Sequence, residues 1–226
     1  MIIIGDGLLG SNIKKITNWD LISRKKDNID FTDLNTYIHL IESHNQIFNC
    51  VGFTDTYSED KETHWKVNYE SVANLVDYCN STNKKIIHIS TDYIYSNSKL
   101  NASENDVPVH CANWYGYTKL LSDGYIQLKS KNYLLIRCSF KPNPFPYENV
   151  VIQQGNFDYV DVISKLIIEL INKNANGIYN VGTEVKTMYD LANRTKKVKI
   201  LDKKIHETMP TDISMDCLKL NKFLNE

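Results

Sequence analysis

The sequence predicts an α/β protein built on a doubly wound parallel sheet. Short apolar runs recur along the 226 residues, and helix-like segments lie between them. That alternation is typical of right-handed βαβ units. The runs are continuous rather than alternating with polar residues, which favours strands buried on both faces. The five runs are residues 1–4, 19–23, 46–51, 85–90 and 133–139.

The segments between these runs supply the remaining elements. In residues 63–82 the valines and the leucine recur at helical spacing, and residues 113–130 and 158–174 predict two more long helices. Residues 177–182 predict a further strand. Residues 141–157 contain three of the five prolines and show no helical period, so they predict a loop. The chain from Thr187 onward is polar and basic.

Composition and charge exclude several classes of partner. The formal net charge is −1 and the isoelectric point is near 6.6, so no basic field would attract nucleic acid or anionic lipid. No run approaches the roughly 18 apolar residues of a membrane span, and the sequence begins without a signal-like region. The five cysteines are far apart and lack C-x-x-C spacing, which predicts neither a metal site nor a disulfide framework. A cytoplasmic protein is expected.

A glycine pattern follows the first apolar run. Gly5, Gly7 and Gly10 form G-x-G-x-x-G between the predicted strand and a helix. The first glycine permits a tight turn, the second lets the backbone approach a pyrophosphate, and the third lets helix and strand pack closely. With Leu8 and Leu9 inside the loop, the pattern predicts a Rossmann-like dinucleotide site at the head of a helix.

The end of the second strand indicates which dinucleotide would bind. An NAD site often has a carboxylate there, on the ribose 2′-hydroxyl. Here the residues are Ser23 and Arg24, and a hydroxyl with a guanidinium suits a 2′-phosphate. NADPH is therefore the expected cofactor, with NADH as the alternative. Lys25 and Lys26 are equally well explained as a solvated basic turn.

Three residues predict carbonyl reduction. A ketone that accepts hydride develops negative charge on oxygen, so it needs a proton donor within hydrogen-bond reach. Tyr115 and Lys119 are four residues apart on a predicted helix and share a face. Lys119 is expected to lower the pKa of Tyr115 and to bind the nicotinamide ribose. Thr91, at the end of the strand 85–90, is expected to hold the substrate carbonyl.

These motifs resemble those of the extended short-chain dehydrogenase/reductases, and most closely the dTDP-4-dehydrorhamnose reductase group of nucleotide-sugar 4-ketoreductases. The stretches "STDYIY" and "YGYTK" are nearly that group's own patterns, and "NCVGFTD" is similar to its N-A-A-x-x-T segment. The resemblance implies that Asp30 and Phe31 lie near the adenine. It also implies that Gly52, Phe53 and Thr54 line the cofactor.

On the substrate side, the resemblance gives Thr91 the role of catalytic hydroxyl and places Asp92 and Tyr93 on the sugar. Phe140 stands where the group has a substrate-facing tryptophan, and Met209 where an arginine usually precedes the proline. The resemblance implies that residues 1–140 form an NADP-binding Rossmann domain. Residues 141–226 would form a reduced substrate-binding part, interleaved with the last Rossmann elements.

The implied function is NADPH-dependent reduction of the C4 ketone of a nucleotide-linked 4-keto-6-deoxyhexose, as in rhamnose-type deoxysugar biosynthesis. The nucleotide stays open among dTDP, UDP and GDP, as does an amino or acetamido group on the sugar. Because residues 141–157 are shorter than the family's segment, the pocket is expected to be open or completed in a homodimer.

Two alternatives remain. A bifunctional 3,5-epimerase/4-reductase of a UDP- or dTDP-sugar would use a cysteine near the catalytic hydroxyl, where this chain has Tyr93. Cys50, Cys111 and Cys138 are better explained as small buried hydrophobes. A non-catalytic NADP-binding regulatory subunit would not need Thr91, Tyr115 and Lys119 together. His88 is interpreted as a core histidine.

Overall fold

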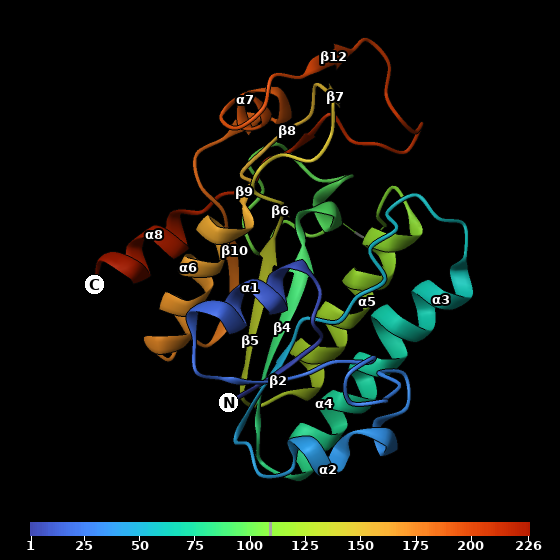
Figure 1. The fold of residues 1–226 in the computed structure, drawn as a ribbon, viewed down its shortest axis with the longest axis vertical. Coiled ribbons are helices and arrows are strands. Elements are labelled where there is room, and N and C mark those ends of the chain that lie inside the picture. Colours follow the sequence, from blue (N-terminus) through green and yellow to red (C-terminus); the bar gives the residue numbers. More distant parts are fainter. Residues whose placement is uncertain (109) are drawn as a thin grey trace.

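The computed structural model describes residues 1–108 and 110–226. Its centre is a six-stranded sheet in which every pair is parallel, with the order β10-β5-β4-β3-β1-β2. The expected α/β class with a doubly wound parallel sheet is confirmed (Figure 1). The strands are β1 (Ile2–Ile4), β2 (Asp20–Ile22), β3 (Gln46–Asn49), β4 (Lys85–Thr91), β5 (Tyr133–Cys138) and β10 (Gly177–Val181).

Helices cover both faces of the sheet. On one face, α1 packs against α6, with α8 beside β10, and on the other face α5 packs against α4 and α3 (Figure 1). Three of these helices were predicted at their places from their apolar periodicity. The helices are α1 (Leu8–Ile16), α2 (Ile38–Ile41), α3 (Lys61–Trp65), α4 (Ser71–Ser81), α5 (Trp114–Lys129), α6 (Val160–Asn172), α7 (Met188–Asn193) and α8 (Leu218–Asn225).

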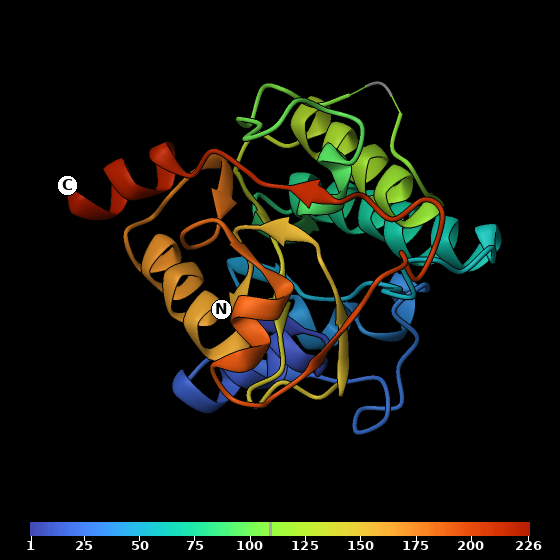
Figure 2. The same ribbon diagram turned by 90° about the horizontal axis from the view of Figure 1, so that it is seen from above.

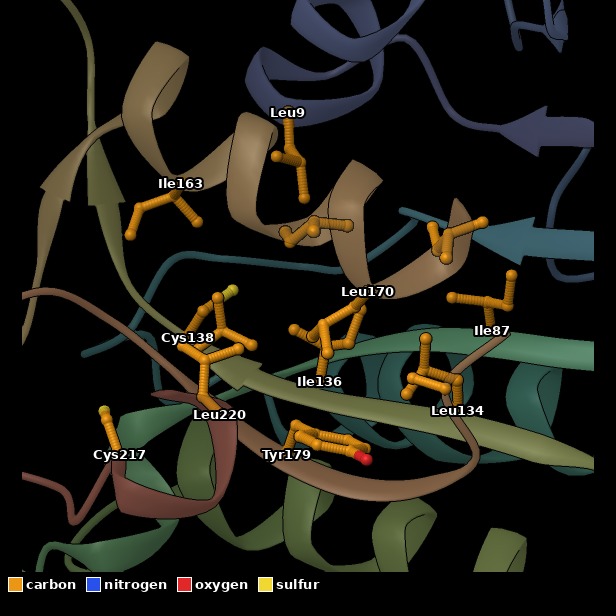
Figure 3. Close-up of a cluster of buried hydrophobic side chains, with 14 of the residues drawn as sticks. Leu9, Ile87, Leu134, Ile136, Cys138, Ile163, Leu170, Tyr179, Cys217 and Leu220 are labelled. Carbon is orange, nitrogen blue, oxygen red and sulfur yellow. The ribbon is translucent and has the colours of Figure 1, made fainter. Parts of the chain in front are cut away.

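Two hydrophobic layers follow from the alternation of side chains along the strands. In β1, Ile3 faces the layer beneath α1 and α6, whereas Ile2 and Ile4 face the layer beneath α4 and α5. Figure 3 shows the first layer, where Ile163 and Leu170 of α6 lie over strand residues. Because both faces are buried, each fully buried isoleucine or leucine contributes roughly 1.5–3 kcal/mol to folding, and the strands need no polar face.

The helix expected over residues 63–82 is present but is not uniform. Between α3 and α4, residues Lys66–Glu70 form a π-helical turn. This turn directs Asn68 inward, where its Oδ1 accepts a hydrogen bond from Phe53 N at 2.8 Å and its Nδ2 donates to Phe53 O at 3.1 Å. The side chain therefore substitutes for a strand neighbour and fixes the loop that follows β3. Such turns are frequent at functional sites.

Small sheets lie beyond the carboxyl ends of the main strands. Residues 141–157, expected as a loop, contain no helix but do contain strands of two or three residues. These strands pair with segments up to about 60 residues away (Figure 1). They are β6 (Phe140–Lys141), β7 (Asn149–Val151), β8 (Gln154–Gly155), β9 (Asp158–Tyr159), β11 (Lys186–Thr187), β12 (Lys199–Leu201) and β13 (Asp212–Ile213).

The polar segment that begins at Thr187 closes this end of the molecule. It forms α7, β12, β13 and α8, and Figure 2 shows it running around the rim before it returns to α8. Its partners are β7 for β12 and β8 for β13. The chain after residue 141 also returns to the main sheet, because β10 pairs with β5. The division at residue 140 thus remains a prediction about how the chain is organised.

A buried ion pair joins the main sheet to α5, and its arginine also bonds the segment that follows β4. Arg137 of β5 and Asp123 of α5 are fully buried, with Nε donating to Oδ2 at 3.0 Å. Arg137 Nη1 also donates to Tyr95 Oη at 2.7 Å and to Glu104 O at 2.9 Å. This network connects β5, α5 and the segment after β4.

Among residues 1–108 and 110–226, no helix has both the length and the hydropathy that a bilayer span needs.

Candidate active site

The main cavity lies at the carboxyl end of the sheet, where the strand order reverses at β1. Strand β1 has β2 on one side and β3 on the other. The chain therefore passes from β1 to β2 in one direction and then crosses back over β1 to reach β3. Ligands of open α/β sheets bind in the crevice at such a point. The cavity has a volume of about 420 Å³. From the predicted set it brings together Gly7, Leu8, Leu9, Gly52, Thr54, Thr91, Asp92, Tyr93, Tyr115, Lys119 and Phe140.

The glycine loop after β1 has the geometry that its sequence predicts. Gly5 has φ +99°, a conformation that side chains rarely adopt. A Cβ on Gly10 would lie 2.0 Å from Gly5 O, so only glycine lets α1 pack this closely on the loop. A Cβ on Gly7 would meet nothing within 4 Å, and no side chain caps the start of α1. The open loop and uncapped amides fit a pyrophosphate.

The loop after β3 forms the opposite wall. Gly52 and Thr54 line the cavity, together with Cys50 and Val51, which the sequence analysis did not select. Phe53 does not line it, because its ring packs against His64 with centroids 4.7 Å apart. Asn68 holds the backbone of Phe53 from behind. This wall is therefore built from backbone and small side chains, which suits a flat ligand lying across it.

The predicted adenosine-side residues do not line the main cavity. Ser23 is buried and its Oγ accepts a hydrogen bond from Lys26 N at 3.1 Å, while Arg24 is exposed. A carboxylate that the sequence analysis missed lies in the same turn: Asp27 Oδ2 accepts a hydrogen bond from Ser23 N at 2.7 Å. Its position four residues after Ser23 was visible in the sequence, but only the turn brings the two together.

Asp30 and Phe31 make local contacts. The Asp30 carboxylate accepts hydrogen bonds from the backbone and hydroxyl of Thr32, and these bonds hold its pKa below the usual range. The Phe31 ring meets Tyr37 edge-on, with centroids 5.8 Å apart. Their placement beside an adenine stays a prediction. The glycines Gly5 and Gly10 support the loop rather than line the cavity.

Thr91, Tyr115 and Lys119 all line the main cavity. Thr91 ends β4, and the first turn of α5 carries Tyr115 and places Lys119 on the same face. Asn113 caps this helix, with Oδ1 accepting a hydrogen bond from Gly116 N at 2.9 Å. Gly116 has room for no side chain, since a Cβ there would lie 3.0 Å from Tyr93 O. The helix therefore begins directly against the end of β4.

Burial sets the ionisation of the Tyr115 phenol and of the Lys119 amine. It raises the pKa of the Tyr115 phenol, and among its neighbours the Thr91 hydroxyl lowers that pKa most. Burial also lowers the pKa of Lys119 to about 8, against the effect of Asp123. The Lys119 Nζ donates to Ile89 O at 2.6 Å and lies 2.9 Å from His88 Nε2. Thr91 is thus the neighbour that lowers the Tyr115 pKa, whereas the sequence predicted that Lys119 would do so.

The substrate side contains a buried carboxyl group and a phenol network. Asp92 is fully buried, which raises its pKa to about 6, and its Oδ1 accepts a hydrogen bond from Thr91 Oγ1 at 3.2 Å. Tyr93 Oη lies 2.9 Å from Tyr57 Oη and accepts a hydrogen bond from Gln153 Nε2 at 3.2 Å. Tyr93 is thereby fixed at the boundary of the cavity.

A second cavity, of about 620 Å³, adjoins the first. Lys141 lines both, and its pKa is lowered by burial and raised by Asp92. Met209, which replaces the family's arginine, also lines the second cavity. The sequence analysis missed Lys141, although it directly follows Phe140 after a predicted strand. The residues that line both cavities are Thr56, Tyr93, Lys141, Tyr147 and Gln153.

The cysteines near the site are not ionised. Cys50 and Cys138 line the main cavity, and burial raises the pKa of both thiols. Burial also raises the pKa of Cys111 to about 12. Within the part of the chain that the structure describes, no three His, Cys, Asp or Glu side chains gather as metal ligands would.

The chain resembles known proteins in its sequence and in its fold. The family model described as RmlD substrate binding domain matches residues 1–141. No curated protein matches the sequence. Similar folds occur in a Bacillus anthracis dTDP-4-dehydrorhamnose reductase in complex with NADP, with 19% identity and a TM-score of 0.83 over 98% of this chain and 91% of that one.

Two further solved structures have similar folds. A hypothetical dTDP-4-dehydrorhamnose reductase from Sulfolobus tokodaii has 23% identity and a TM-score of 0.81, over 98% of this chain and 93% of that one. A Thermus thermophilus UDP-glucose 4-epimerase in complex with NAD has 15% identity and a TM-score of 0.79, over 98% of this chain and 92% of that one. The same fold thus accompanies both ketone reduction and epimerisation.

Proposed function

Since the chain belongs to the RmlD substrate-binding domain family, we propose that it reduces the C4 ketone of a nucleotide-linked 4-keto-6-deoxyhexose with NADPH. The observation that carries the proposal is the meeting of Thr91, Tyr115 and Lys119 in one cavity with the open loop at Gly7. A dinucleotide site and a proton donor thereby share one space. The NADP and NAD bound in the reductase and the epimerase of similar fold support a nicotinamide dinucleotide.

The chemistry assigns one task each to the dinucleotide, Tyr115 and Thr91. The dinucleotide, when bound along Gly7, Leu8 and Gly52, supplies the hydride. Tyr115 donates its phenolic proton to the oxygen of the substrate ketone as carbon C4 accepts the hydride, so a carbonyl becomes an alcohol. The Thr91 hydroxyl positions that oxygen. The raised pKa of Tyr115 keeps the phenol protonated, which is the form that a reduction requires.

The second cavity supports a substrate larger than a simple ketone. It adjoins the reaction cavity and shares Tyr93 and Lys141 with it, so a ligand can extend from one into the other. A sugar would lie beside Asp92 and Tyr93, and the nucleotide would lie beyond Lys141. Lys141 is the only basic side chain that lines the second cavity among the described residues. A ligand with negative charge near Lys141 fits this arrangement.

The decisive experiment is a substrate panel. The protein is incubated with NADPH and with 4-keto-6-deoxysugars linked to dTDP, UDP or GDP, with and without amino substituents, and the products are identified by NMR. Oxidation of NADPH with formation of a C4 alcohol would support the proposal. Binding of NADPH without turnover of any member would favour the alternative of a non-catalytic NADP-binding subunit.

We expect Arg24→Ala to weaken NADPH binding by about 10-fold and NADH binding by less than twofold. A charge-assisted hydrogen bond to the 2′-phosphate contributes about 1.5–3 kcal/mol, and 1.4 kcal/mol is a factor of ten. Dissociation constants for both cofactors, measured by fluorescence titration, test this. The matched control is Lys25→Ala, which removes a neighbouring exposed cation of the same turn. Equal loss for both cofactors would mean that Arg24 does not contact the 2′-phosphate.

We expect reduction without epimerisation. Epimerisation needs a base that removes the proton next to the ketone. Tyr93, Cys50 and Cys138 line the cavity, and burial raises the pKa of all three, so none of them is an anion at neutral pH. In heavy water the product should carry no deuterium at C3 or C5 beyond that of an enzyme-free control. Uptake that disappears in Cys138→Ser would instead identify a bifunctional epimerase/reductase.

A further inference from the structure

A buried chain of hydrogen bonds runs from the loop after β3 to the lysine of the active site. It joins Val51 N, Asn49, His88 and Lys119, and the three side chains are almost completely buried. Val51 N donates to Asn49 Oδ1 at 3.0 Å. Asn49 Nδ2 lies 3.2 Å from His88 Nδ1, and His88 Nε2 lies 2.9 Å from Lys119 Nζ. Nothing in the proposed reaction uses His88 or Asn49.

The direction of each of these hydrogen bonds follows from the donor at one end of the series, Val51 N. A backbone N–H is always a donor, so the Asn49 atom that faces Val51 is its oxygen, and the atom that faces His88 is its NH₂ group. The NH₂ group can only donate. His88 Nδ1 must therefore accept, which means that it carries no proton. A neutral imidazole has one N–H, and it is consequently on Nε2, which faces Lys119.

Two donors cannot form a hydrogen bond with each other. If His88 Nε2 carries a proton, Lys119 must offer a lone pair to it, and only an uncharged amine has one. The remaining N–H groups of such an amine can donate to Ile89 O, at 2.6 Å, and into the cavity. We infer that His88 is a positioning residue that donates its Nε2–H to a neutral Lys119 amine in the cofactor-free protein.

The surroundings of Lys119 agree with an uncharged amine. Burial lowers its pKa, and Asp123, which opposes this from α5, is already paired with Arg137. Cys50 and Cys138 face it from the ends of β3 and β5 with thiols whose own pKa values are raised. His88 on β4 has its pKa held well below the usual range, so it does not become a cation beside Lys119.

The arrangement makes protonation of Lys119 depend on His88. An ammonium at this position requires His88 Nε2 to accept, and His88 can do so only by moving its proton to Nδ1, where it would face the Asn49 NH₂ group. Binding a proton to Lys119 thus costs one buried hydrogen bond. Burial lowers the pKa of Lys119 to about 8, and the fixed His88 tautomer adds to this effect. Lys119 is therefore expected to become an ammonium only below pH 7.

The test measures the ionisation of Lys119 directly and needs no turnover, so its failure is distinct from failure of the proposed function. Protein labelled with ¹³C at lysine Cε is titrated by NMR without cofactor, and Lys119→Met identifies the signal. In the unaltered protein the Lys119 signal should titrate below pH 7, so that the amine is uncharged at neutral pH. In His88→Gln, whose amide can rotate to offer its oxygen, the midpoint should rise by at least one pH unit, a tenfold gain in proton affinity.

Two comparisons complete the design. Lys85 is a second buried lysine, which donates to Ala175 O at 2.7 Å and does not touch His88, so its titration should be unchanged in His88→Gln. Asn49→Ala removes the donor that fixes the tautomer while it keeps His88, and it should also raise the Lys119 midpoint. A Lys119 midpoint near its ordinary value in the unaltered protein, or an equal midpoint in folded His88→Gln, would overturn the inference.

Discussion

Replacing Tyr115 with phenylalanine is expected to reduce the rate of ketone reduction at least roughly 100-fold, because the variant lacks the only proton that we assign to the substrate oxygen. Binding of NADPH should change by less than about twofold, since the dinucleotide is held mainly by the glycine loop. Stopped-flow or steady-state oxidation of NADPH gives the rate, and fluorescence titration gives the affinity. The two measurements separate loss of the acid from loss of the cofactor.

Tyr117 is the matched control for this substitution. It lies on the same helix two residues later and does not line the main cavity. Its ring stacks on His110 at the surface side of α5, so Tyr117→Phe removes a hydroxyl without touching the reaction space. This variant should turn over at the original rate. Full activity in Tyr115→Phe would remove Tyr115 from the mechanism.

The pH dependence of the reaction follows from the same residue. The pKa of Tyr115 is raised by burial, so the phenol is protonated below its ordinary pKa and remains so above it. A decline of turnover between pH 6 and 9 would therefore reflect another group. Asp92, whose pKa burial raises to about 6, is the carboxyl group in the cavity that changes charge at the acidic end of this range.

Gly10→Ala is expected to damage cofactor binding severely. The new methyl group would lie 2.0 Å from Gly5 O, so α1 must move away from the loop whose amides would hold the pyrophosphate. Overpacking of this kind costs typically about 1–3 kcal/mol, which lowers the melting temperature by several degrees in a chain of this size. Affinity for NADPH should fall at least roughly tenfold, because the displaced amides lose their geometry.

Gly124→Ala provides the comparison. A Cβ at Gly124 of α5 would meet nothing within 4 Å, and alanine favours a helix over glycine by up to about 1 kcal/mol. This variant should be as stable as the original protein or slightly more so, with unchanged NADPH affinity. Calorimetry and titration of both variants distinguish crowding at Gly10 from a general effect of removing glycine. An unperturbed Gly10→Ala protein would contradict the close packing of α1.

The sequence predicted those parts whose local pattern is strong. Short, continuous apolar runs marked the strands of the main sheet, and the G-x-G-x-x-G spacing marked the loop at Gly7. Residues four apart on one helix brought Tyr115 and Lys119 together without any knowledge of the remaining fold. In each case the information lies within about 20 consecutive residues.

The missed features depend on contacts between distant segments. Strands of two residues, such as β8 and β13, have no period of their own and exist only where they pair. Lys141 gains its position between two cavities from the chain around it. His88 was correctly interpreted as buried, but its tautomer is fixed by Asn49 and Val51, nearly 40 residues earlier. The actual neighbours of Lys119 could not be read from its helix.

The pairing of the small sheets also determines the order in which the parts of the protein can be finished during synthesis. The main sheet is complete once β10 has left the ribosome, whereas β7 and β8 still wait for β12 and β13. At about 5–20 residues per second, the later segments follow within seconds. The nascent chain therefore passes through a stage at which the dinucleotide loop is formed while the walls of the second cavity are not. A dinucleotide that binds at this stage would stabilise the sheet before any nucleotide-sugar could be held.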